Sequence, residues 1–448
     1  MRFILEQSDA ALTSHSGLAL IGLLMEKTQL RARLNQTIVP TCPNPDISHG
    51  EVVASYLGLL AQGKSDFEDI EPFRHDKFFA QALGCEYVPS APTMRQRFDA
   101  APHAEWEAII REEVAKLLRC ANAPLTPSHS KLLPLDIDVS PFDNSDSKKE
   151  GVEITYKKVM GYAPLFCYLG HEGYLIDLEL RKGSTHSQKG AAAVLKRALV
   201  AARQIIGQKH LRILVRQDAG NDDIDNIKTC LELNAKNDGP RVEWLIKRNL
   251  RNETKEKWHA LALEHGTREQ PRPGKKVWHG SIAVEREGVA RPLRIVFRVI
   301  ERTSSPTGQL FLEPTLEVDT YWTSLRHEAK TVIALYHEHG TMEQFHSEIK
   351  DELDLERLPS GKFATNSLVL HLGMLAYNML RVLGQESLKV KEQPLRKVVK
   401  RRRVRTVIQN LITLAARVVK HARAYKLVFG HHSPWYNIYR FVYCAFST

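Results

Sequence analysis

The sequence predicts an α/β fold: a mixed β-sheet core with a β-rich insertion, flanked by an α-helical N-terminal region and basic C-terminal helices. Short apolar, strand-like segments around one Ala-rich helical segment predict the core; the strand candidates are 132–140, 161–170, 174–183, 211–220 and 242–248. Turn signals between alternating segments (Pro-Gly, Glu-Gly and Ser-Pro-Thr-Gly) predict the insertion. Apolar residues at helical spacing predict the flanks.

These changes of pattern divide the 448 residues into five parts. The first is helical, the second and fourth are the two portions of the core, the third is the insertion and the fifth is basic. Their boundaries are 1–130, 131–248, 249–325, 326–390 and 391–448. In the last part, seven of the ten residues in 396–405 are basic, and 407–429 is expected to form one helix.

One short helix of the first part carries basic residues. Ser90 or Thr93 is expected to cap it, and it presents Arg95 and Arg97. Such a helix can lie against DNA or can be an ordinary capped surface helix, and the sequence leaves both readings open.

The composition favours a polyanionic partner. Lys and Arg number 63 against 52 Asp and Glu, which gives a net charge of +11. This balance suits nucleic acid or an anionic membrane, although basic soluble proteins are common. We expect no apolar run of membrane-spanning length, no membrane partner and a cytoplasmic location. The six cysteines are at least 35 residues apart and form no CxxC pair, which argues against a structural zinc site.

The segment 336–350 carries more polar groups than a surface helix needs. On a helix with about 100° per residue, Tyr336, His339, Glu343 and Lys350 share one narrow arc, and apolar residues occupy the neighbouring arc. One face therefore buries the helix, and the edge beside it presents a carboxylate flanked by Tyr, His and Lys. That edge is either simply solvated or part of a functional site.

Three acidic residues are candidates for one site. Asp138 lies on the first core strand, Asp218 ends a later strand, and Glu343 lies on the helix after the insertion. Converging carboxylates repel one another unless a cation lies between them. Two Mg²⁺ ions held by such a trio would activate water or a 3′-hydroxyl for phosphoryl transfer on nucleic acid. The spacing alone does not require convergence, and each acid taken singly suits a structural or solvated role.

At the first two acids the sequence resembles a family of bacterial insertion-sequence transposases, the DDE class. The likeness covers most of the chain and is closest to the group named for insertion sequence 1380, a relative of the insertion sequence 4 group. LDIDVS resembles the first-acid strand, in which Ser or Thr follows the acid by two residues, as Ser140 follows Asp138. LVRQDAG resembles the second-acid strand and gives Asp218.

The third motif of these groups has Tyr, two residues, Arg, three residues, Glu, six residues and Lys. Tyr336, Glu343 and Lys350 match this spacing, and His339 stands where Arg is usual. Because Arg is always charged and bidentate towards phosphate, His339 implies a weaker or pH-dependent grip on phosphate, or an impaired copy.

The resemblance implies an RNase H-like core whose three acids bind two Mg²⁺ ions, with Mn²⁺ as a substitute. It also implies that the insertion separates the second acid from the third. The family pattern points to Asp138 as the first acid and leaves Asp136, on the same face of the strand, as the fallback.

The resemblance further implies residues that contact DNA: Tyr336, His339, Lys350, Arg401, Arg402 and Arg403. Tyr336 equally suits core packing, and the basic run equally suits a solvated helix. In related enzymes an aromatic residue from the insertion region can stack on a flipped base; four Trp residues lie in or near this region, and the sequence singles out none.

The predicted function is Mg²⁺-dependent DNA cleavage at element ends, followed by strand transfer into target DNA. The expected partners are the terminal inverted repeats, bound by 1–130 and the basic C-terminal helices, the target DNA, and a second copy in a homodimer on paired ends. The alternatives are a catalytically impaired or domesticated DNA-binding protein and a nuclease without strand transfer.

Overall fold

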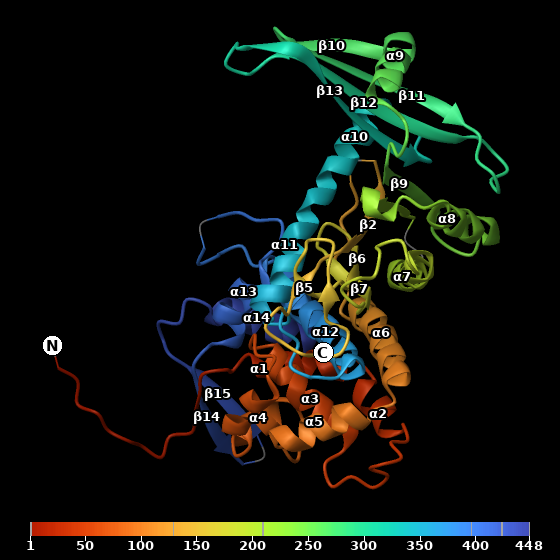
Figure 1. The fold of residues 1–448 in the computed structure, drawn as a ribbon. Coiled ribbons are helices and arrows are strands. Elements are labelled where there is room, and N and C mark those ends of the chain that lie inside the picture. Colours follow the sequence, from red (N-terminus) through yellow and green to blue (C-terminus); the bar gives the residue numbers. More distant parts are fainter. Residues whose placement is uncertain (1, 129, 208–209, 396, 423, 448) are drawn as a thin grey trace.

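A computed structural model gives the arrangement of the chain (Figure 1) and describes residues 2–128, 130–207, 210–395, 397–422 and 424–447. Within these residues, the largest sheet has nine strands in the order β10-β11-β12-β13-β9-β8-β2-β6-β7. Both parallel and antiparallel pairs occur in it. The predicted α/β class with a mixed sheet is therefore confirmed.

The core half of this sheet is built from apolar strands. They are β2 (Leu132–Val139), β6 (Leu165–Leu169), β7 (Tyr174–Glu179), β8 (Arg212–Gln217) and β9 (Val242–Arg248). β2 runs parallel to β8, and β8 runs parallel to β9, whereas β6 is antiparallel to β2. Parallel neighbours end at the same edge of a sheet, so the residues that follow β2 and β8 meet there.

Helices and a small sheet complete the core. The Ala-rich helix α7 (Ala191–Ile206) leads from β7 to β8, and α8 (Ile224–Lys236) makes the crossover between the parallel strands β8 and β9. After β2, a three-stranded sheet forms from β3 (Phe142–Asp143), β4 (Glu153–Ile154) and β5 (Met160–Tyr162).

The insertion extends the core sheet. Helix α9 (Lys255–His265) is followed by an antiparallel meander of β10 (Gly266–Arg272), β11 (Lys275–Val284), β12 (Leu293–Ser304) and β13 (Leu310–Thr323). The last strand returns to the core, because Thr320 to Thr323 pair with Arg248 to Leu245 of β9. Figure 1 shows this meander at the top of the molecule, with α10 (Ala329–His337) descending from it to the core.

The N-terminal region is helical and packs beneath the core (Figure 1). Its elements are α1 (Leu18–Glu26), α2 (Leu30–Asn35), α3 (His49–Leu60), η1 (Phe67–Phe73), α4 (Lys77–Ala82), α5 (Ala91–Ala100) and α6 (His103–Cys120). Ser48 and Glu51 form a reciprocal cap at the start of α3, which is buried along its whole length. Ser90 caps α5, as expected, but Arg97 of that helix is buried and Arg95 faces outward.

Helix α12 (Phe363–Ser387) corrects the expectation that no apolar segment reaches membrane-spanning length. It is long and apolar enough to cross a membrane, but 94% of its most apolar window is buried inside the protein. It packs against α6 and β7 and is the central helix of the core.

The C-terminal part contains a β-hairpin where one helix was predicted for 407–429. The helical turn α13 (Val404–Val407) and the π-turn η5 (Ile408–Ile412) lead into β14 (Ala416–His421) and β15 (Ala424–Phe429), and α14 (Tyr436–Phe446) follows. β14 also pairs with the short strand β1 (Leu12–Thr13). The helical prediction counted apolar residues, but Leu427 and Phe429 alternate on one side of the hairpin, which is the period of a strand.

Candidate active site

Asp138 and Asp218 lie next to each other at the carboxyl ends of two parallel strands. Ile137 of β2 is in register with Gln217 of β8, and each acid follows directly on one of these residues. Asp138 is partly open, with 28% of its side chain exposed, and Asp218 precedes the short 3-10 turn η2 (Ala219–Asn221). The sheet therefore brings together two of the three predicted acids.

The electrostatic environment of Asp218 opposes its ionisation. Burial, and then the charge of Asp138, raise the pKa of Asp218, although the Asn221 side-chain amide donates a 2.8 Å hydrogen bond to its carboxylate. Burial and the same two carboxylates also raise the pKa of the Tyr156 hydroxyl to about 12. Two acids that repel each other in a partly buried site provide hard oxygen ligands for a divalent cation.

Asp136, the alternative candidate for the first acid, forms a buried ion pair. Both of its oxygens accept hydrogen bonds from Arg216, at 2.6 and 2.7 Å, and His339 Nδ1 lies 3.0 Å away. Burial disfavours the charged form, but the charges of Arg216 and His339 outweigh it and lower the pKa of Asp136 to about 2. Since Asp136 and Arg216 are each 2% exposed, this pair holds β2 to β8 and leaves Asp138 as the open carboxylate.

The segment that carries the third acid is an interrupted helix. α10 passes into the 3-10 turn η3 (Glu338–Thr341), then into α11 (Met342–Ser347) and the π-turn η4 (Glu348–Glu352). The last turn of α10 is held to β8, because Arg216 donates a 2.7 Å hydrogen bond to the Leu335 carbonyl. Such 3-10 and π interruptions often occur at functional sites.

Two histidines of this helix lie close to aspartates of β2. His339 contacts Asp136, and His346 Nε2 lies 3.5 Å from Asp138 Oδ2. His346 is 6% exposed, and its Nδ1 lies 3.4 Å from the Tyr168 hydroxyl. His346 was not predicted from the sequence, although it stands three residues after Glu343 and therefore on the same side of the helix.

Glu343 lies on the helix between these two histidines and is exposed. Within the part of the chain that the structure describes, no three His, Cys, Asp or Glu side chains lie close enough together to hold a metal ion. Glu343 therefore lies on the helix whose histidines lie close to Asp136 and Asp138. Its carboxylate does not form a three-acid group with Asp138 and Asp218.

Tyr336 and Lys350, at the two ends of the motif, have contacts inside the protein. Tyr336 packs against Tyr321 with ring centroids 4.8 Å apart, and burial and the nearby Asp218 raise the pKa of its hydroxyl. Lys350 donates a hydrogen bond to the Pro141 carbonyl and lies 3.3 Å from Glu356. Both side chains lie beside the ends of β8 and β2.

The three arginines predicted to contact DNA differ in exposure. Arg401 packs over Phe345 and donates a 2.7 Å hydrogen bond to Gln344. Arg402 is 4% exposed and packs over Trp435, so its side chain is held inside the protein. Arg403 has 47% of its side chain exposed. Arg396, the first residue of the basic run, lies outside the described residues.

A pocket of about 580 Å³, which the sequence did not predict, lies near the end of β8. It is lined by four basic and three acidic side chains, one of which is Asp222, four residues after the second acid. The guanidinium groups of Arg248 and Arg286 both lie over the ring of Trp322 of β13, and the indole donates a 2.9 Å hydrogen bond to Asp222. Arg251 lines the same pocket. The sequence left four Trp residues as candidates for an aromatic residue that stacks on a flipped DNA base. The structure places one of them, Trp322, next to Asp222, which follows β8.

Comparison with known families identifies the chain's relatives. The family described as "Transposase DDE domain group 1" matches residues 4–447. The chain belongs to this family. As a DDE transposase, it is an enzyme that acts on DNA, which confirms the predicted enzyme class. No curated protein sequence matches the chain.

Solved structures also match this DDE transposase. Seven chains do so, and one of them is the cryo-EM structure of a piggyBac transposase synaptic complex with hairpin DNA. That chain is 11% identical, with a TM-score of 0.42, and the match covers 90% of this chain and 82% of that one.

Proposed function

We propose that this DDE transposase cleaves DNA at element ends and transfers the freed 3′-hydroxyl into target DNA, using Asp138, Asp218 and Glu343 with two Mg²⁺ ions. We also propose that it belongs with the bacterial insertion sequence 1380 group, on the spacing of its third motif. The observation that carries the proposal is the register of β2 and β8, which places Asp138 and Asp218 side by side.

Asp138 and Asp218 would hold the metal ions, and Glu343 would join them. The two adjacent acids fit a cation, because burial and the charge of Asp138 oppose ionisation of Asp218. Glu343 stands on the same helix as His339 and His346, which contact the strand that carries Asp138. Bound Mg²⁺ would lower the pKa of water and stabilise the leaving oxygen.

The remaining motif residues would order the site. The Asp136–Arg216 pair and His339 fix the helix against β2, and we assign His339 this role in addition to any contact with phosphate. Lys350, held at the Pro141 carbonyl after β2, would contact a backbone phosphate once DNA displaces Glu356. Tyr336 would close the other end of the site beside Asp218.

DNA would extend from this site over the basic surfaces around it. Arg251 and Arg286 line the pocket near the end of β8, together with Arg248, whose guanidinium is paired with Glu253, and Arg403 is exposed near the other end of the helix. Guanidinium groups bind phosphate through paired N–H donors, so both surfaces suit the DNA backbone. The two DNA ends would be joined by a homodimer on paired terminal repeats.

A cleavage assay tests the assignment of the acids. The substrate is linear DNA that carries the inverted repeats flanking the coding region, with Mg²⁺ and then Mn²⁺. Wild type should cut at the repeat ends, and Asp138→Asn, Asp218→Asn and Glu343→Gln should each lose at least about a hundredfold in rate. Asp351→Asn, an exposed acid two turns further along the helix, is the matched control and should retain activity.

The outcomes separate the alternatives. If Glu343→Gln cuts as well as wild type, Glu343 is not the third acid. Cutting without joined products indicates a nuclease that lacks strand transfer. Specific binding to the repeats without cutting by wild type indicates a DNA-binding protein without catalysis.

A further inference from the structure

The segment that precedes β1 is an extended arm with three consecutive large apolar side chains. Residues 2–9 have no helix or strand structure and are exposed. Phe3, Ile4 and Leu5 are 84%, 88% and 93% exposed, and Arg2 and Glu6 flank them. Figure 1 shows this arm extending away from the body of the protein. Three consecutive large apolar side chains on a free arm are an unfavourable arrangement in water unless something covers them.

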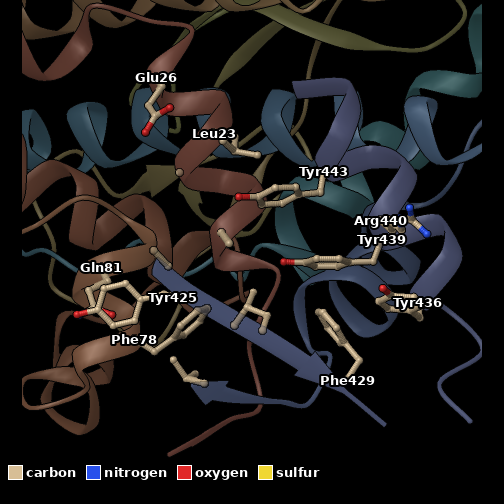
Figure 2. Close-up of a pocket in the computed structure, with 15 residues that line it drawn as sticks. Leu23, Glu26, Phe78, Gln81, Tyr425, Phe429, Tyr436, Tyr439, Arg440 and Tyr443 are labelled. Atoms are coloured by element: carbon tan, nitrogen blue, oxygen red, sulfur yellow. The ribbon is translucent and has the colours of Figure 1, made fainter. Parts of the chain in front are cut away.

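A pocket of about 450 Å³ lies close to the base of the same arm. It is formed by α1, α4, the β14–β15 hairpin and α14, and β1, at the base of the arm, pairs with β14. Its lining is rich in aromatic side chains; they are Phe78, Tyr425, Phe429, Tyr436, Tyr439 and Tyr443. In Figure 2, Tyr439 and Tyr443 project side by side from α14 towards Leu23 of α1. The volume suits a few apolar side chains.

We propose that Phe3, Ile4 and Leu5 of one copy of this chain occupy this pocket in a second copy, and that the exchange is reciprocal. The arm and the pocket share the β1–β14–β15 sheet, so two copies that exchange arms about a two-fold axis would bring these sheets together. Ile4 lies nine residues before Thr13, a reach of about 30 Å for an extended chain.

Charge complementarity supports this occupant. Glu26 and Arg440 lie on opposite sides of the pocket in Figure 2, and both are exposed. Within the described residues neither of them has an ion-pair partner, and the same holds for Arg2 and Glu6 of the arm. An arm laid across the pocket with Arg2 towards Glu26 would direct Glu6 towards Arg440.

The oligomeric state of the full-length protein without DNA tests the exchange. Wild type should sediment as a concentration-dependent dimer. Ile4→Asp should weaken the dimer at least about a hundredfold, because a charge replaces the buried apolar side chain. Leu312→Asp, a fully exposed apolar residue of β13 outside the arm and the pocket, is the control and should dimerise normally. A wild type that remains monomeric, or equal weakening by Leu312→Asp, overturns the proposal.

Two mixing experiments exclude simple misfolding. Ile4→Asp and the pocket variant Leu23→Glu should each be monomeric, yet their mixture should form heterodimers through the one intact arm and the one intact pocket. Glu6→Arg and Arg440→Glu should each weaken the dimer, and the double variant should restore it. If the mixture stays monomeric and the double variant is not restored, the arm does not enter the pocket of a second copy.

The dimer is independent of DNA cleavage, so the two proposals can fail separately. Asp218→Asn should dimerise as wild type does, even though it is expected not to cut. If the wild type is monomeric and Ile4→Asp weakens only DNA binding, the arm serves nucleic acid and the exchange is wrong.

Discussion

Asp136 and Arg216 form a buried two-pronged ion pair across β2 and β8, two residues before Asp138 and Asp218. The strand register that places Asp138 beside Asp218 therefore also pairs Asp136 with Arg216 two residues earlier. The Asp136–Arg216 pair holds β2 to β8, whereas Asp138 and Asp218 are two acids side by side at the edge of the sheet. This division predicts different consequences for two neighbouring aspartates.

Replacing Asp136 should damage stability, whereas replacing Asp138 should not. Asp136→Asn leaves the Arg216 guanidinium buried without its charge partner, which we expect to cost about 3–5 kcal/mol in the free energy of unfolding. Asp138→Asn removes a partly open carboxylate from a like-charged neighbour and should change that free energy by less than about 1 kcal/mol. Urea unfolding of both variants measures this. Equal losses for both would contradict the separation of the two roles.

The contribution of the Asp136–Arg216 ion pair to the free energy of unfolding should depend on pH in the acid range. The pKa of Asp136 is lowered to about 2 in the folded protein from 3.8, so its contribution is present above about pH 4 and is lost as the pH falls through about 2. The difference in unfolding free energy between wild type and Asp136→Asn should therefore be constant near neutral pH and shrink between pH 4 and pH 2. A difference that grows on acidification would show that the pair does not stabilise the charged carboxylate.

The sequence predicted the strands beside Asp138 and Asp218 because the signals there are local. Apolar runs of strand length end at Asp138 and Asp218, and the fold brings such ends together when the strands are parallel neighbours. The pairing of Asp136 with Arg216 is a contact between residues 80 apart, and no local pattern reveals it. The fallback assignment was therefore left open until the register was known.

The incorrect prediction of one helix for residues 407–429 has a different physical origin. Residues 416–429 combine β-branched and aromatic side chains with basic ones, so their apolar content fits a helix or a hairpin. The hairpin forms because β1, some 400 residues earlier in the chain, pairs with β14, and because the hairpin packs against α1 and α14. Tertiary contacts decide between the two local structures, and the sequence pattern does not contain them.

His346 should support the first acid without determining the fold. Its ring lies 3.5 Å from the Asp138 carboxylate, and partners of this kind orient groups that bind metal. His346→Phe keeps a planar ring and removes the nitrogen, so we expect cleavage to fall roughly 10–100-fold and to need more Mg²⁺ for half-maximal rate. The measurement is the single-turnover rate against Mg²⁺ concentration, with thermal unfolding to check folding. His337→Phe, an exposed histidine on the same helix, is the control. An unchanged Mg²⁺ dependence would remove His346 from this role.

Arg402 and Arg403 should differ in their effect on DNA binding. Arg402 is 4% exposed, donates a 2.9 Å hydrogen bond to the Ser387 hydroxyl and packs over Trp435. Arg402→Gln should therefore destabilise the fold by about 1–3 kcal/mol through lost packing and hydrogen bonds. Arg403 is half exposed, but it contacts Glu352, whose side chain is 4% exposed, at 2.5 Å, so removing the Arg403 charge should also cost some stability. If Arg403 binds a phosphate, Arg403→Gln should in addition lower the slope of log affinity against log salt concentration by about 1. Gel shifts over a range of salt concentrations measure the slope. A slope that falls for Arg402→Gln but not for Arg403→Gln, in samples confirmed to be folded, would reverse the assignment of the two arginines.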